Sequence, residues 1–123
     1  YTNVEDAEKF VQETNVDSLA VSIGTSHGLY KGIPKINFQR LSELHNILNI
    51  PLVLHGGSGS GDDNLNRCAR EGISKINIYS DFMDAGAKSV SEKSFTNYID
   101  VLKVSREGMK TTLKHYYHVF ETR

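Results

Sequence analysis

Two histidines occupy positions where metal chemistry is possible. His27 and His55 each follow a short apolar run, and a glycine comes directly after each of them. Neutral imidazoles bind zinc well, and a catalytic zinc site usually takes three protein ligands and leaves one position open. Either histidine alone is better explained as a loop residue bonded to backbone, but two in equivalent positions favour a shared metal ion. The other three histidines, His45, His115 and His118, fall on predicted helices as surface or packing residues.

A glycine-rich loop and a few polar residues supply the other candidate groups. The run Gly56-Gly57-Ser58-Gly59 precedes a predicted helix, and exposed N–H groups at such a place bind anions. It matches no nucleotide-binding fingerprint, so a plain flexible loop is the alternative. Asn77 and Ser80 are candidates for phosphate contacts; otherwise they are a buried polar strand residue and a helix N-cap. Lys31 could reach a phosphate as a point charge, although an exposed loop lysine is usually only solvated.

Lysine and thiol chemistry are both disfavoured. A Schiff-base mechanism needs a desolvated lysine, and no lysine lies within Leu19–Ile23 or Leu52–Leu54. Lys75 lies at the N-terminal end of its predicted strand, away from the edge where such folds build sites. Cys68 lies in the apolar stripe of a predicted helix, which indicates a core residue rather than a nucleophile.

Short strands alternate with helices along the chain, and this alternation must position the candidate groups. A near-continuous apolar run predicts a strand at Leu19–Ile23, and two further strands are predicted at Pro51–His55 and Lys75–Ile78. Such regular alternation implies a parallel sheet, either part of a (β/α)8 barrel or a small doubly wound sheet. Three strands alone would leave two open edges, which favours a missing half.

Five helices are predicted around these strands. The first has a capping box from Thr2 to Glu5 and a stop at Asn15, and the second, capped by Asn37, runs from about Phe38 to Leu48. The third opens with Asp62 and Asp63 and is closed by Gly72, the fourth begins near Ser80 or Asp81, and a long helix begins near Tyr98. The last two helices are expected to bury Phe82, Met83, Ala87, Val90, Leu102, Met109, Leu113, Tyr116 and Phe120.

Composition narrows the class of protein. The chain has 123 residues, 38% of them hydrophobic and 24% charged, which is typical of one globular domain and too short for a complete barrel of about 250 residues. A net charge of −1 argues against nucleic-acid binding through a basic field. The apolar runs are far too short to span a membrane. One cysteine and no visible secretory leader favour the cytoplasm, and a start at Tyr1 suggests a piece of a longer protein.

In combination these motifs resemble the zinc-dependent, class II ketose-bisphosphate aldolases of the fructose- or tagatose-bisphosphate type. The resemblance covers essentially the whole chain and is strongest over Val16–Gly32, Pro51–Gly59 and Lys75–Ile78. It implies an α/β fold that is a partial TIM (β/α)8 barrel, about strands six to eight with the C-terminal helices. Residues 1–123 would then be the C-terminal half of the barrel, with the N-terminal half absent.

The resemblance also assigns roles to individual residues. His27 and His55 would be two of the three zinc ligands, and Asn77 would touch the substrate near its reacting carbons. The phosphate of dihydroxyacetone phosphate would be held by Gly28, Lys31, Gly57, Ser58 and Ser80. A monovalent cation beside that phosphate would be bound by backbone around Gly28 and Gly56.

The implied reaction is reversible aldol cleavage of a ketohexose bisphosphate to dihydroxyacetone phosphate and glyceraldehyde 3-phosphate, with zinc as Lewis acid. In the family the remaining ligand, the acid/base aspartate and a mobile-loop glutamate lie in the N-terminal half, so this segment alone is expected to be inactive. The full-length form is expected to be a homo-oligomer. Tyr79 stands where fructose-specific relatives tend to carry Asp and tagatose-type relatives Ala, so the sugar epimer stays unassigned.

Three alternatives stay open at this point. The first is an aldolase for another phosphorylated keto sugar, which only the missing half would distinguish. The second is a non-catalytic sugar-phosphate-binding subunit that kept the half-barrel. The third is a small doubly wound binding module with no metal.

Overall fold

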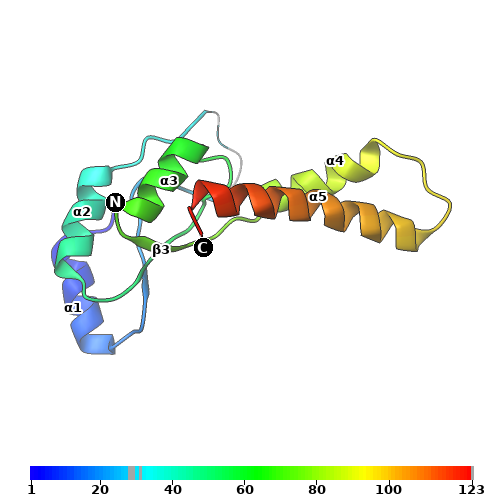
Figure 1. Cartoon of the computed structure of the whole chain (residues 1–123). Coiled ribbons are helices and arrows are strands. Elements are labelled where there is room, and N and C mark those ends of the chain that lie inside the picture. The colour runs from blue at the N-terminus through cyan, green and yellow to red at the C-terminus, as the bar shows by residue number, and fades with distance from the viewer. Residues whose placement is uncertain (28–29, 31, 123) are drawn as a thin grey trace. The chain divides into compact units, whose positions relative to one another are not determined.

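The structure, a computed structural model, describes residues 1–27, 30 and 32–122. The elements among these residues (Figure 1) are α1 (Val4–Thr14), β1 (Leu19–Ala20), α2 (Phe38–Ile47), β2 (Leu52–Leu54), α3 (Asp62–Arg70), β3 (Ile73–Ile76), α4 (Ser80–Ser91) and α5 (Tyr98–Val119). The three strands form one parallel sheet in the order β1-β2-β3. The chain divides into two compact units, Tyr1–Asn77 and Ile78–Arg123.

The first strand is shorter than the apolar run Leu19–Ile23 predicts. Val21 still donates its N–H to the carbonyl of Val53 at 3.1 Å, and Val21 and Ile23 are both buried. Beyond that point the backbone bonds to other segments: Ser22 N–H donates to Thr2 Oγ1, and Ile23 accepts from Asn37 N–H. The apolar run therefore enters the core as predicted, but its last residues leave the sheet ladder.

The third strand begins and ends earlier than predicted, at Ile73 and Ile76 rather than at Lys75 and Ile78. Leu52 pairs with Ile73 and Leu54 with Ile76, with one irregularity in the register. Asn77 consequently lies just past the strand, at the end where a parallel sheet carries its functional groups.

An asparagine side chain caps each of the first two helices by accepting a hydrogen bond from a backbone N–H. The predicted Thr2 cap is wrong: Asn3 caps α1 by accepting from Asp6 N–H at 3.0 Å, since the Thr2 hydroxyl instead accepts from Ser22 N–H. The stop at Asn15 is confirmed, with a left-handed φ of 52°. The Asn37 cap of α2 is also confirmed, with Oδ1 accepting from Arg40 N–H.

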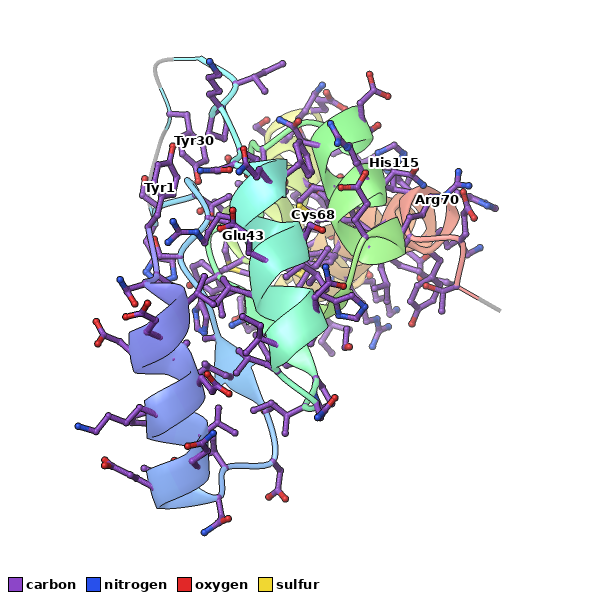
Figure 2. All side chains as sticks on the ribbon, turned by 90° about the vertical axis from the view of Figure 1, so that its left-hand side faces the viewer. Tyr1, Tyr30, Glu43, Cys68, Arg70 and His115 are labelled. Carbon is purple, nitrogen blue, oxygen red and sulfur yellow. The ribbon has the colours of Figure 1, made fainter. Side chains whose placement is uncertain are left out.

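The core of the first unit lies between the sheet and its helices. Its fully buried side chains include Ile23, Leu41, Leu44, Leu52, Leu54, Leu65 and Cys68. The expectation that Cys68 (Figure 2) is a core residue is confirmed. Burial, with a contribution from nearby Glu71, raises the pKa of its thiol from 9.0 to about 11.

The second unit is a pair of helices, α4 and α5, that lie side by side in Figure 1. They approach closely at glycines: a Cβ on Gly108 would lie 2.7 Å from the Ala85 carbonyl, and one on Gly86 2.7 Å from the Met109 side chain. Tyr116 is buried, as predicted, and its hydroxyl donates to Asp81.

The predicted packing of four other side chains is wrong. Met83, Ala87, Leu102 and Leu113 are exposed. The less exposed positions of α5 include Val101, Val104, Gly108 and Thr112. Leu102 and Leu113 are each displaced by one residue from this row, so the close glycine contact turns them away from α4.

No helix within the residues that the structure describes combines the length and the hydrophobicity that crossing a bilayer requires.

The burial of Cys68 gives a direct test of the first unit. At pH 8 a thiol with a pKa of about 11 is ionised in about one molecule in a thousand, and the thiolate is the reactive form. We expect a thiol-specific reagent to label Cys68 far more slowly in the native protein than in urea, as followed by mass spectrometry of the labelled peptide. Equal rates in the two conditions would show that the packing around Cys68 is wrong.

Candidate functional site

The structure brings the two predicted metal-ligating histidines together. His27 and His55 lie in the loops that follow the β1 region and β2, and the carboxyl ends of neighbouring parallel strands share one edge of a sheet. His27 Nε2 and His55 Nδ1 are 3.2 Å apart, with ring centroids 5.3 Å apart and ring planes at 68°. Both rings are solvent-exposed and line an open pocket of about 250 Å³.

This separation fits zinc. Two ligand nitrogens on a tetrahedral zinc at about 2.0–2.1 Å lie about 3.3 Å from one another, and the two imidazole nitrogens are 3.2 Å apart. The distance equally suits an N–H···N bond between the rings when the ion is absent. Among the described residues, no group of three His, Cys, Asp or Glu side chains could hold a metal. A catalytic set of three ligands therefore needs one from outside them.

Asn77 is a third polar group at this strand end. Its Nδ2 lies 3.2 Å from His55 Nδ1 and 3.3 Å from His55 Nε2. Lys75 donates its ammonium to Asn77 Oδ1, which assigns the orientation of the amide. His27 and Asn77 thus converge on one nitrogen of His55, and the amide presents a donor beside the proposed metal position.

Some backbone amides of the glycine-rich loop already donate hydrogen bonds within the protein, so they do not face an anion. Gly57 N–H donates to the Asn77 carbonyl at 3.1 Å, and Ser60 N–H donates to the Gly57 carbonyl. The Gly57 amide is therefore already bonded to the Asn77 carbonyl, and it helps to hold the shape of this turn. The half-buried Ser58 lies in the same turn.

Gly56 allows the two histidine loops to meet. Its φ is +68°, in the left-handed region, and a Cβ there would lie 2.3 Å from the Ser26 carbonyl oxygen. Its own carbonyl accepts from the hydroxyls of Tyr30 at 2.9 Å and Ser60 at 3.1 Å. The expected monovalent cation stays a prediction, because Gly28, the other residue of its site, lies outside the described residues.

Three predicted substrate-binding residues are not tested by the described structure. Gly28 and Lys31 lie outside the described residues. Ser80 is the first residue of α4 and belongs to the second unit. Its alternative role as N-cap is wrong, since Tyr79 occupies that position and makes no side-chain cap hydrogen bond.

Sequence reasoning missed two hydroxyls that join the histidine loops. Thr25 donates its hydroxyl to the His55 carbonyl at 2.7 Å. Tyr30 contacts the backbone of both Ser26 and Gly56 through its own hydroxyl. Neither follows a spacing rule, because the bonds from Thr25 to the His55 carbonyl and from Tyr30 to the Gly56 carbonyl join loops that are distant in sequence.

Parallel α/β folds carry their functional groups at the carboxyl ends of the strands, and the two imidazoles and the glycine turn lie at that edge of this sheet. The chain belongs to the class II fructose-bisphosphate aldolase family: the family model "Fructose-bisphosphate aldolase class-II" matches residues 1–123.

Two solved structures place the fold within that family. The YdjI aldolase from Escherichia coli K12 is 33% identical, with a TM-score of 0.90 over 98% of this chain and 46% of that protein. The fructose-bisphosphate aldolase (Fba) from Campylobacter jejuni has the same fold, with 22% identity and a TM-score of 0.79 over 98% of this chain and 45% of that protein. The chain spans about half the length of both, and its three parallel strands and helices match part of an aldolase barrel.

Gly56 and Gly32 form a matched pair for testing the contact between the loops. Gly56→Ala places a methyl group against the Ser26 carbonyl at a left-handed φ, so we expect it to lower the free energy of unfolding by at least about 2 kcal/mol. Gly32→Ala meets nothing within 4 Å and should change it little. Urea unfolding of both variants checks this, and equal stability of the two would contradict the described contact.

Proposed function

We propose that the protein containing this chain catalyses the zinc-dependent, reversible aldol cleavage of a ketohexose bisphosphate to dihydroxyacetone phosphate and glyceraldehyde 3-phosphate. The observation that carries the proposal is the 3.2 Å separation of His27 Nε2 and His55 Nδ1 at adjacent strand ends. Family membership and the likeness to the YdjI aldolase support the reaction class. In this proposal residues 1–123 supply the C-terminal half of the barrel, about strands six to eight with the C-terminal helices.

Each site residue that the structure describes has a defined role in the proposal. His27 and His55 hold the zinc ion, which would act as a Lewis acid on the substrate ketone. The Asn77 amide, oriented by Lys75, donates to a substrate oxygen near the reacting carbons. The Ser58 hydroxyl donates to the phosphate, and Gly57 holds the turn in place through its bond to the Asn77 carbonyl.

Further phosphate contacts are proposed for Gly28, Lys31 and Ser80. Anchoring the phosphate fixes the rest of the substrate relative to the metal, and such positioning removes much of the entropic part of a barrier. The third ligand and the acid/base group are proposed to come from residues outside this chain, so residues 1–123 alone are expected to be inactive. A homo-oligomeric, cytoplasmic protein is part of the same proposal.

A second candidate substrate is another phosphorylated keto sugar. The YdjI aldolase, the more similar of the two solved structures, is not named for any particular sugar. Tyr79, which directly precedes α4, matches neither the Asp expected for the fructose type nor the Ala expected for the tagatose type. A panel of phosphorylated ketoses assayed with the full protein would decide between the two candidates.

Removing the metal tests the proposal at its centre. A chelator should abolish aldol cleavage by the full protein, and zinc should restore it. His55→Ala should lose both bound zinc and turnover while keeping its circular dichroism spectrum. His118→Ala, at an exposed position of α5, should keep both. Full activity of the chelated protein or of His55→Ala would reject the zinc role. If the wild-type protein bound zinc but cleaved no sugar phosphate, a non-catalytic binding subunit would be favoured instead.

The phosphate contact is tested separately at Ser58. Ser58→Ala removes a hydroxyl that donates to a charged group, a bond worth about 1.5–3 kcal/mol. We expect KM for the bisphosphate to rise about tenfold or more, together with weaker inhibition by inorganic phosphate. Ser18→Ala, at an exposed position before β1, is the control. An unchanged KM and unchanged phosphate inhibition would remove Ser58 from the site.

A further inference from the structure

One phenol hydroxyl links the two loops that carry the histidines. The Tyr30 hydroxyl accepts from Ser26 N–H at 2.8 Å and lies 2.7 Å from the Ser26 carbonyl and 2.9 Å from the Gly56 carbonyl. Ser26 directly precedes His27, and Gly56 directly follows His55. The hydroxyl therefore contacts the backbone beside both imidazoles, although the loops lie far apart in sequence.

We propose that Tyr30 is a positioning residue that sets the distance between His27 and His55 and thereby the affinity of the protein for its metal ion. This inference rests on the proposed function, because it concerns the same pair of ligands. Tyr30 acts through the backbone of its neighbours, and its hydroxyl bonds to main-chain groups rather than to either imidazole.

The Tyr30 hydroxyl acts both as acceptor and as donor, so it bonds to both histidine loops. A phenol has one proton to donate and oxygen lone pairs that accept. Ser26 N–H uses one lone pair, which leaves the single proton to be shared between the carbonyls of Ser26 and Gly56. Replacement by phenylalanine would leave the Ser26 amide without this acceptor and both carbonyls without this donor.

The ring of Tyr30 adds a contact with the glycine-rich turn. A Cβ on Gly59 would lie 3.3 Å from the Tyr30 ring, so the ring packs directly on that backbone. Tyr30 is half-buried and lies in the loop that precedes α2 (Figure 2). Together with the bond from the Thr25 hydroxyl to the His55 carbonyl, this fixes the loop after β2 from two sides.

The consequence for metal binding follows from the narrow range of zinc–ligand distances. Zinc accepts imidazole nitrogens within about 0.1–0.2 Å of its preferred distance. A shift of either loop by a fraction of an ångström would move the nitrogens away from their 3.2 Å separation. Groups that orient metal ligands without touching the metal typically contribute about 10–100-fold to affinity. Because Tyr30 works through backbone, the lower end of that range is expected.

The test compares Tyr30→Phe with Tyr117→Phe in the full protein, the second variant removing a hydroxyl from an exposed position of α5. Zinc affinity is measured by competition with a chromophoric chelator, and Co²⁺ replaces zinc to give a visible absorption spectrum of the site. We expect Tyr30→Phe to bind zinc about tenfold more weakly and to alter the Co²⁺ spectrum, while Tyr117→Phe changes neither. Thermal unfolding without metal reports any general loss of stability separately.

A measurement on the wild-type protein keeps the inference testable should Tyr30→Phe fold poorly. The amide of Ser26 should exchange with deuterium slowly, because its N–H is bonded to the Tyr30 hydroxyl. Exchange at the rate of an unprotected amide would overturn the inference, and so would unchanged zinc affinity and an unchanged Co²⁺ spectrum in Tyr30→Phe. Wild-type protein that binds neither ion would instead show that the proposed metal site itself is wrong.

Discussion

The parallel pairing of β1 and β2 is the constraint on which the site depends. Leu19 pairs with Leu52 and Ala20 with Val53, so the loops after both strands emerge at the same edge of the sheet. Leu52, Val53 and Leu54 are all buried, so both faces of β2 lie in the core in this register. The loops then approach so closely that only glycine fits at residue 56. Two histidines distant in sequence become neighbours as a result.

The site is built from groups that serve structure and chemistry together. The Asn77 backbone continues the bonding of β3 to β2 and fixes Gly57, while its side chain reaches His55. Thr25 and Tyr30 bond to main-chain groups of the facing loop instead of filling the core. Such cross-loop bonds limit how far the exposed imidazoles can separate. Pre-organisation of this kind lowers the cost of ordering the ligands when an ion binds.

Sequence patterns predicted the elements well, because apolar runs and caps are local signals. The Asn37 cap, the Asn15 stop and the placement of His27 and His55 at neighbouring strand ends all follow from such signals. The patterns failed where a partner distant in the chain decides the outcome. Thr2 bonds to Ser22 instead of capping α1, and the glycine contact between α4 and α5 leaves Leu102 and Leu113 exposed. For the same reason no local signal could reveal the cross-loop role of Tyr30.

Anomalous diffraction from crystals of the zinc-loaded full protein tests the central claim most directly. At the zinc absorption edge, the account predicts one strong peak that lies about 2.0–2.1 Å from both His27 Nε2 and His55 Nδ1. The same crystals should place the Tyr30 hydroxyl against Ser26 and Gly56. A zinc peak bound elsewhere, with the two imidazoles unligated, would contradict the account.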